Sequence, residues 1–96
     1  MENYRNTATG KFVDDMLQEQ NVQHALRVMA DHGVPPAAFF GSRLAHHATH
    51  LSDHDHRMIG KMVKEFMVGQ GYSLSHEDQP IKNMQLFKTA ATYHKD

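Results

Sequence analysis

The stretch PPAAFFGSRLAHHATHLSDHDHRMIGKMVKEFM, residues 35–67, carries the clearest helical pattern in the chain. In its second half, apolar residues recur one helical turn apart: Met58, Ile59, Met62, Val63, Phe66 and Met67. Ser52 is of a residue type that caps helices, and the acids after it stand where the helix dipole favours negative charge. Gly69 is expected to end the helix, because glycine adopts the left-handed conformation without strain. The pattern therefore predicts a helix over residues 53–68.

The first half of this stretch predicts a separate helix over residues 36–50. Pro35 and Pro36 suit a helix start, since the N–H that proline lacks has no partner in the first turn. Apolar residues then recur along one face: Phe40, Leu44, Ala48 and Leu51. Ser52 favours a turn just before it, although one bent helix over residues 36–68 also fits the pattern.

The flanking segments predict two more helices. Residues 10–32 hold two apolar stripes that are out of phase with each other. Good helix formers join the stripes, so we expect one long helix rather than a second helix capped by Asn21. Pro80 is expected to begin a helix over residues 80–93, after a loop over residues 69–79.

The predicted fold class is all-α, because we find no strand-like alternation in the sequence. It consists of a small bundle of about four helices, roughly 10–32, 36–50, 53–68 and 80–93. Residues 10–96 are expected to form a single domain. The polar residues 1–9 lack periodicity and are expected to form a flexible arm.

Composition excludes several classes of protein. The 96 residues suffice for one domain, and the absence of cysteine excludes a disulfide scaffold and a thiolate zinc site. No apolar run is long enough to span a membrane and no secretory signal is visible, so we expect a cytoplasmic protein. No phosphate-binding loop or nucleophile motif is present, so we do not expect an enzyme. The net charge of −1 gives no general attraction to nucleic acid or membrane.

A cluster of histidines lies between the two central helices. His46 and His50 are one helical turn apart and could share a Zn²⁺ or Ni²⁺ ion, with His54 as a third ligand. No other cofactor is expected. The alternative interpretations are a solvated polar face and a pH-responsive cluster.

A second hypothesis is a helix-turn-helix DNA-binding regulator, with its turn near Gly33 and its second helix over residues 36–50. The candidate contacts to nucleic acid are Arg43, Arg57, Lys61 and Lys64. The last three recur along one helix face. Only Arg43 is a permanent cation on the second helix, which weakens this interpretation, because duplex binding needs several phosphate contacts.

The interpretation favoured by the sequence is a small non-enzymatic module that regulates or inhibits a larger protein partner. Apolar side chains exceed what one small core would hide, and methionine is adaptable at interfaces. The candidate contact residues are Phe39, Phe40, Met58, Met62 and Met67. A homodimer would use the same apolar surface.

The histidine cluster generates a direct test with metal ions. If His46 and His50 form a site, Zn²⁺ or Ni²⁺ will raise the melting temperature by mass action, and His46→Ala or His50→Ala will remove most of the gain. His76→Ala serves as the control and should retain the gain in melting temperature. We expect calorimetry to find only loose binding, as two helical histidines supply two ligands; tight binding that His46→Ala abolishes would contradict this expectation.

Overall fold

The computed structural model describes residues 2–44, 51–80 and 89–96. Within these residues there are five helices followed by a two-stranded antiparallel sheet. The elements are α1 (Glu2–Arg5), α2 (Ala8–Leu17), α3 (Gln20–Asp31), α4 (Ala38–Leu44), α5 (Asp53–Gly69), β1 (Tyr72–Pro80) and β2 (Thr89–Lys95). The predicted all-α bundle is therefore wrong, and the fold is mixed.

The β-hairpin replaces the predicted loop over residues 69–79 and the described end of the predicted helix over 80–93; residues 81–88 of that helix lie outside the described residues. Tyr72 and Leu74 alternate with serines, which is the period of a strand. Leu74 pairs with Tyr93 in the register. The rings of Tyr72 and Tyr93 are both buried, so contacts with the helices supply the stabilisation that a free hairpin lacks.

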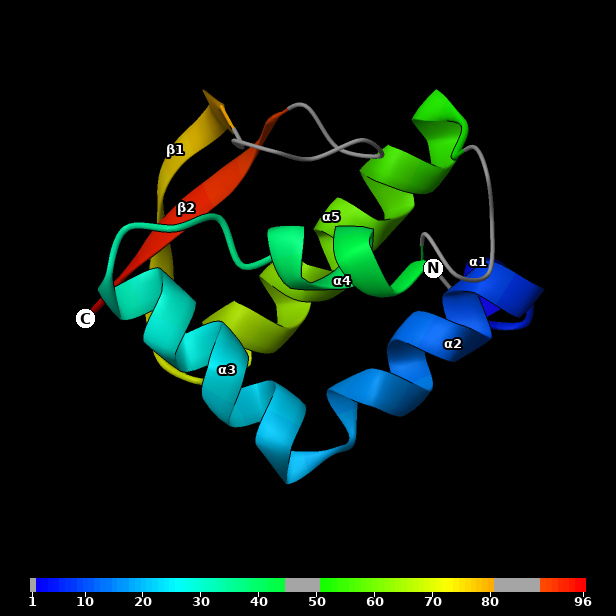
Figure 1. Ribbon diagram of the computed structural model, residues 1–96, viewed down its shortest axis with the longest axis horizontal. Helices are drawn as coiled ribbons and strands as arrows, with labels where there is room; N and C mark the ends of the chain where they lie inside the picture. Colours follow the sequence, from blue (N-terminus) through cyan, green and yellow to red (C-terminus); the bar gives the residue numbers. More distant parts are fainter. Residues whose placement is uncertain (1, 45–50, 81–88) are drawn as a thin grey trace.

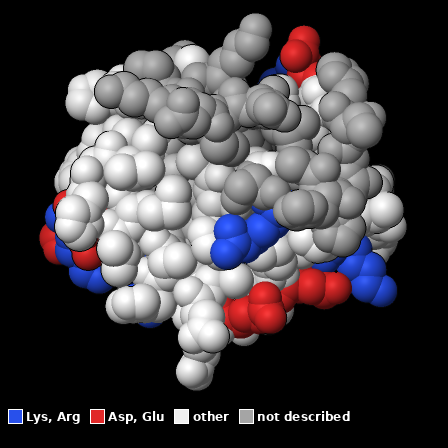
Figure 2. Space-filling model, in the orientation of Figure 1, with Lys and Arg blue, Asp and Glu red and all other residues white. Residues whose placement is uncertain are grey.

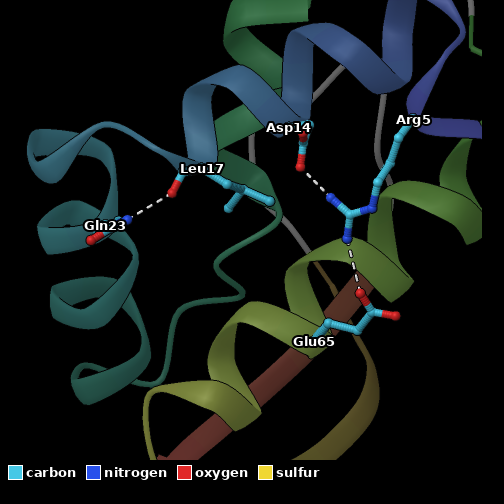
Figure 3. A network of polar contacts seen from close by, with 5 residues as sticks. All are labelled: Arg5, Asp14, Leu17, Gln23 and Glu65. Atoms are coloured by element: carbon cyan, nitrogen blue, oxygen red, sulfur yellow. Dashed lines mark hydrogen bonds and ion pairs between the residues drawn. The ribbon is translucent and has the colours of Figure 1, made fainter. Parts of the chain in front are cut away.

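The long helix predicted over residues 10–32 is also wrong, because the chain turns at Gln18 and Glu19. Glu19 has an extended backbone and is the N-cap of α3. It lies two residues before Asn21, the cap in the alternative prediction of two helices. The turn brings both out-of-phase stripes onto one core. The Gln23 side chain donates a hydrogen bond of 2.8 Å to the carbonyl of Leu17, so an unpaired group at the end of α2 is satisfied (Figure 3).

The helix predicted over residues 53–68 is confirmed as α5. Ser52 and Asp55 form a reciprocal capping box, in which each side chain accepts from the other residue's backbone N–H. Ser52 is extended, so α5 begins anew after α4. Gly71, with φ of +88°, is the left-handed residue after α5, rather than Gly69.

The helix predicted over residues 36–50 begins later than expected. Residues 35–37 form the turn before α4, which spans Ala38–Leu44. Residues 45–50 of the prediction lie outside the described residues. The turn before α4 starts at Gly33, whose φ of +73° lets the N–H groups of Gly33 and Val34 bond to the carbonyls at the end of α3.

The core lies around α5. Figure 1 shows α2 and α3 meeting in a V, α5 running behind α4, and the hairpin standing beside the C-terminal end of α3. Helix α5 contacts α2, β1 and β2, and α3 contacts β2. The largest fully buried side chains are those of Phe40, Leu26, Leu44, Ile59, Met62, Met67, Val13, Val63 and Pro36.

The N-terminal segment, expected to be a flexible arm, carries α1 and is joined to the core. Tyr4 is 6% exposed and donates a hydrogen bond of 2.7 Å to Asp55. Arg5 pairs with Asp14 and, at 2.9 Å, with Glu65 (Figure 3). A Cβ on Gly10 would lie 1.9 Å from the carbonyl oxygen of Tyr4, so only glycine allows α1 to pack this closely on α2.

The hydrogen bond between Tyr4 and Asp55 changes the acidity of both groups. Burial and the neighbouring carboxylate raise the pKa of Tyr4. Burial alone would raise the pKa of Asp55, but hydrogen bonds from Tyr4 and Ser52 outweigh it and hold that pKa below its usual 3.8. The ionised form of Asp55 therefore stabilises the fold.

Tyr4→Phe is expected to cost about 1–3 kcal/mol at pH 7, because Asp55 loses a charged hydrogen bond. Because the pKa of Asp55 is lower in the folded protein than in the unfolded chain, its ionised form stabilises the fold at pH values above 3.8. This stabilisation is lost as the pH falls through the lowered pKa. The difference in free energy of unfolding between wild type and Tyr4→Phe should therefore be smaller in acid. Urea unfolding at pH 7 and near pH 3 measures it, and an equal difference at both pH values would contradict the assignment.

Candidate nucleic-acid interface

The outward face of α5 carries Arg57, Lys61 and Lys64, which we call the basic ridge. All three residues are exposed, and their spacing places them on one stripe of the helix. The stripe extends about 10 Å along the axis, at 1.5 Å per residue. The opposite face of α5 is buried in the core, so packing holds the basic ridge towards solvent.

Two acidic side chains of α5, Glu65 and Asp55, have other partners, whereas Asp53 lies one helical turn before Arg57. Glu65 pairs with Arg5 from α1, and Asp55 accepts hydrogen bonds from Tyr4 and Ser52. Among the residues that the structure describes, no ion pair involves a cation of the basic ridge. The described residues therefore do not neutralise the basic ridge through ion pairs.

The junction between α5 and the hairpin is held by two further cations. Arg27 of α3 donates a hydrogen bond of 3.0 Å to the side chain of Gln70. Lys95 of β2 donates one of 3.1 Å to the Gln70 carbonyl and lies 4.8 Å from the centre of the Tyr72 ring. Tyr72 in turn donates to Asp31, so the hairpin has a fixed direction relative to α3 and α5.

The residues predicted to bind a protein partner lie in the core or at its edge. Phe40, Met62 and Met67 are 0% exposed. Phe39 and Met58 are partly buried and pack against the core. Phe39 also meets Phe40 edge to face at 5.5 Å. Three of these five side chains therefore lie inside the domain, and the other two lie at the edge of its core.

The residues predicted for a helix-turn-helix come from two different helices. Gly33 does make a turn, but the described helix after it, α4, has only 7 residues. Arg43 of α4 lies 3.6 Å from the centre of the Phe39 ring, whereas the basic ridge belongs to α5. On the face drawn in Figure 2, Lys and Arg stand singly or beside Asp and Glu.

The histidine prediction falls largely outside the described residues, which include neither His46 nor His50. His54 is exposed in the first turn of α5, where its ring lies 5.7 Å from that of Tyr4. Where side chains are described, no group of three or more histidines and carboxylates is placed to hold a metal ion.

A groove of about 520 Å³, which no sequence pattern indicates, lies between the end of α3 and the hairpin. At its rim Ser75 bonds to His94, and His94 lies 3.9 Å from Asp96. Ser75, His94 and Asp96 are the residue types of a catalytic triad, but the resemblance is one of composition alone. His94 and Asp96 are 58% and 63% exposed, and Asp96 also accepts from Ser73, so the shielded geometry of a triad is missing here.

Compared with known protein families, curated proteins and solved structures, the chain finds no match. Over the described residues, no helix is both long enough and apolar enough to cross a membrane.

Met62→Ala tests whether the methionine stripe is core or a docking surface. The side chain is fully buried, so truncation should cost about 2–5 kcal/mol in urea unfolding. Val68→Ala is the control on the same helix: Val68 is 54% exposed, and its loss should change stability by less than about 0.5 kcal/mol. Equal, small effects of both substitutions would show that Met62 is not core.

Proposed function

We propose that this protein is a non-enzymatic module that binds double-stranded nucleic acid through the basic ridge of α5. The observation that carries the proposal is the pattern of Arg57, Lys61 and Lys64: three exposed cations on one stripe, none in an ion pair with a described residue. Such a stripe matches the phosphate groups of a duplex, whose neutralisation releases condensed counterions.

The dimensions of α5 suit a duplex. Its 17 residues give a rod about 25 Å long and about 10–12 Å across. The major groove of B-form DNA is about 12 Å wide and admits a helix or a two-stranded ribbon. The hairpin follows α5 after only two residues and is fixed to α3, so both elements are presented rigidly. Rigid presentation lowers the entropy lost on binding.

Three of the four cations expected to contact nucleic acid, Arg57, Lys61 and Lys64, belong to α5, so the duplex would meet α5 rather than a second helix over residues 36–50. Duplex binding is preferred over a protein partner docked on the Met and Phe residues, because Phe40, Met62 and Met67 are buried. A partner could reach them only by opening the core. The net charge of −1 implies that binding depends on the local patch and weakens strongly with salt.

Duplex affinity should fall as salt rises, with a logarithmic slope of about −2.7 if three phosphates are neutralised. Between 50 and 200 mM salt, this slope lowers the affinity about 40-fold. Fluorescence anisotropy with a labelled duplex measures the slope.

Replacing all three ridge cations with Gln should abolish duplex binding, and Lys61→Gln alone should reduce the slope by about one. Lys11→Gln removes an exposed cation from α2 and is the charge-matched control for the single substitution. If the triple variant binds as wild type does, or if wild type binds no duplex at low salt, the proposed function is wrong.

A further inference from the structure

Gly60 lies near the middle of the 17-residue helix α5. Among the described residues, a Cβ built at this position meets nothing within 4 Å. Its φ is not positive, since the glycines with positive φ in the described chain are Gly33 and Gly71. Glycine inside a helix is less favourable than alanine, so the sequence carries a cost here that no contact with a described residue explains. At Gly10, by contrast, a close backbone contact requires glycine.

The position of Gly60 relates it to the basic ridge. It follows Arg57 by three residues and precedes Lys64 by four. At about 100° per residue, Gly60 lies about 60° around the axis from Arg57 and about 40° from Lys64. The helix backbone therefore carries no side chain beside the line of cations; Gly60 is half-buried, and no described atom lies within 4 Å of the position that a Cβ would take.

We propose that Gly60 is the point where one sugar–phosphate strand of a bound duplex lies against the backbone of α5. This inference rests on the proposed function and specifies how the duplex is seated. Glycine permits close approach of another backbone, because no side chain holds the two apart. Arg57 and Lys64 flank Gly60 along the axis and can reach phosphates on either side of the contact. Their charge selects an anionic strand as the occupant.

A side chain at position 60 should push this strand away from the basic ridge. Gly60→Ala adds one methyl group, whose carbon meets no described atom within 4 Å, and Gly60→Gln adds a longer uncharged chain. Alanine should raise the melting temperature, because it favours the helix. Duplex affinity should nevertheless fall, by about tenfold for Gly60→Ala and further for Gly60→Gln, as phosphate contacts lengthen.

Gly69→Ala is the matched control. Gly69 is also a helical residue of α5, and no described atom lies within 4 Å of an added Cβ. It lies nine residues on, about 180° around the axis from Gly60. Gly69→Ala should leave duplex affinity unchanged while the helix is equally intact by circular dichroism.

The experiment measures the anisotropy of a labelled duplex with wild type, both Gly60 variants and Gly69→Ala, together with sedimentation of the free proteins. Gly60 variants that bind as tightly as wild type overturn the inference while leaving the proposed function intact, provided that the triple ridge variant has lost binding. A change in self-association of Gly60→Ala, with unchanged duplex affinity, overturns it in favour of a second copy of this chain. Wild-type protein that binds no duplex removes both proposals.

Discussion

Burial of the inner face of α5 is the contact on which the rest of the domain depends. Ile59, Met62, Val63 and Met67 lie on this face, and each buried side chain of this size contributes about 1.5–3 kcal/mol. Helix α2 and both strands pack against the same helix. The same burial determines which residues of α5 face outward. The position of the basic ridge is therefore a result of core packing, and substitutions in the core that rotate α5 would also move its cations.

Both ends of α5 are secured by residues distant in sequence. At the N-terminal end, Tyr4 bonds to the capping residue Asp55. At the C-terminal end, Arg27 and Lys95 hold Gln70 from two different elements. A helix fixed in this way keeps its outward side chains in a constant arrangement.

Local signals explain which parts of the fold were predictable. Helix α5 follows from the sequence because its cap and apolar stripe agree, and the basic ridge follows from the spacing of its cations. The break between α2 and α3 at Gln18 and Glu19 cannot be predicted from the local sequence, because both residues favour helix. Only the packing of α2 and α3 on a shared core imposes the turn. The hairpin depends likewise on burial of Tyr72 and Tyr93. An apolar stripe has the same period whether it faces a core or a partner, so the spacing alone does not show that Met62 is buried.

The docking of α1 has a consequence for synthesis of the chain. Tyr4 finds its partner Asp55 only 51 residues later. At about 5–20 residues per second, the N-terminal segment waits roughly 3–10 seconds on the ribosome before that partner has been made. During this interval the Tyr4 ring has no complete core to enter. Residues 2–5 are thus made before α5 but fixed only after it, and the segment is exposed to proteases and chaperones until α5 emerges.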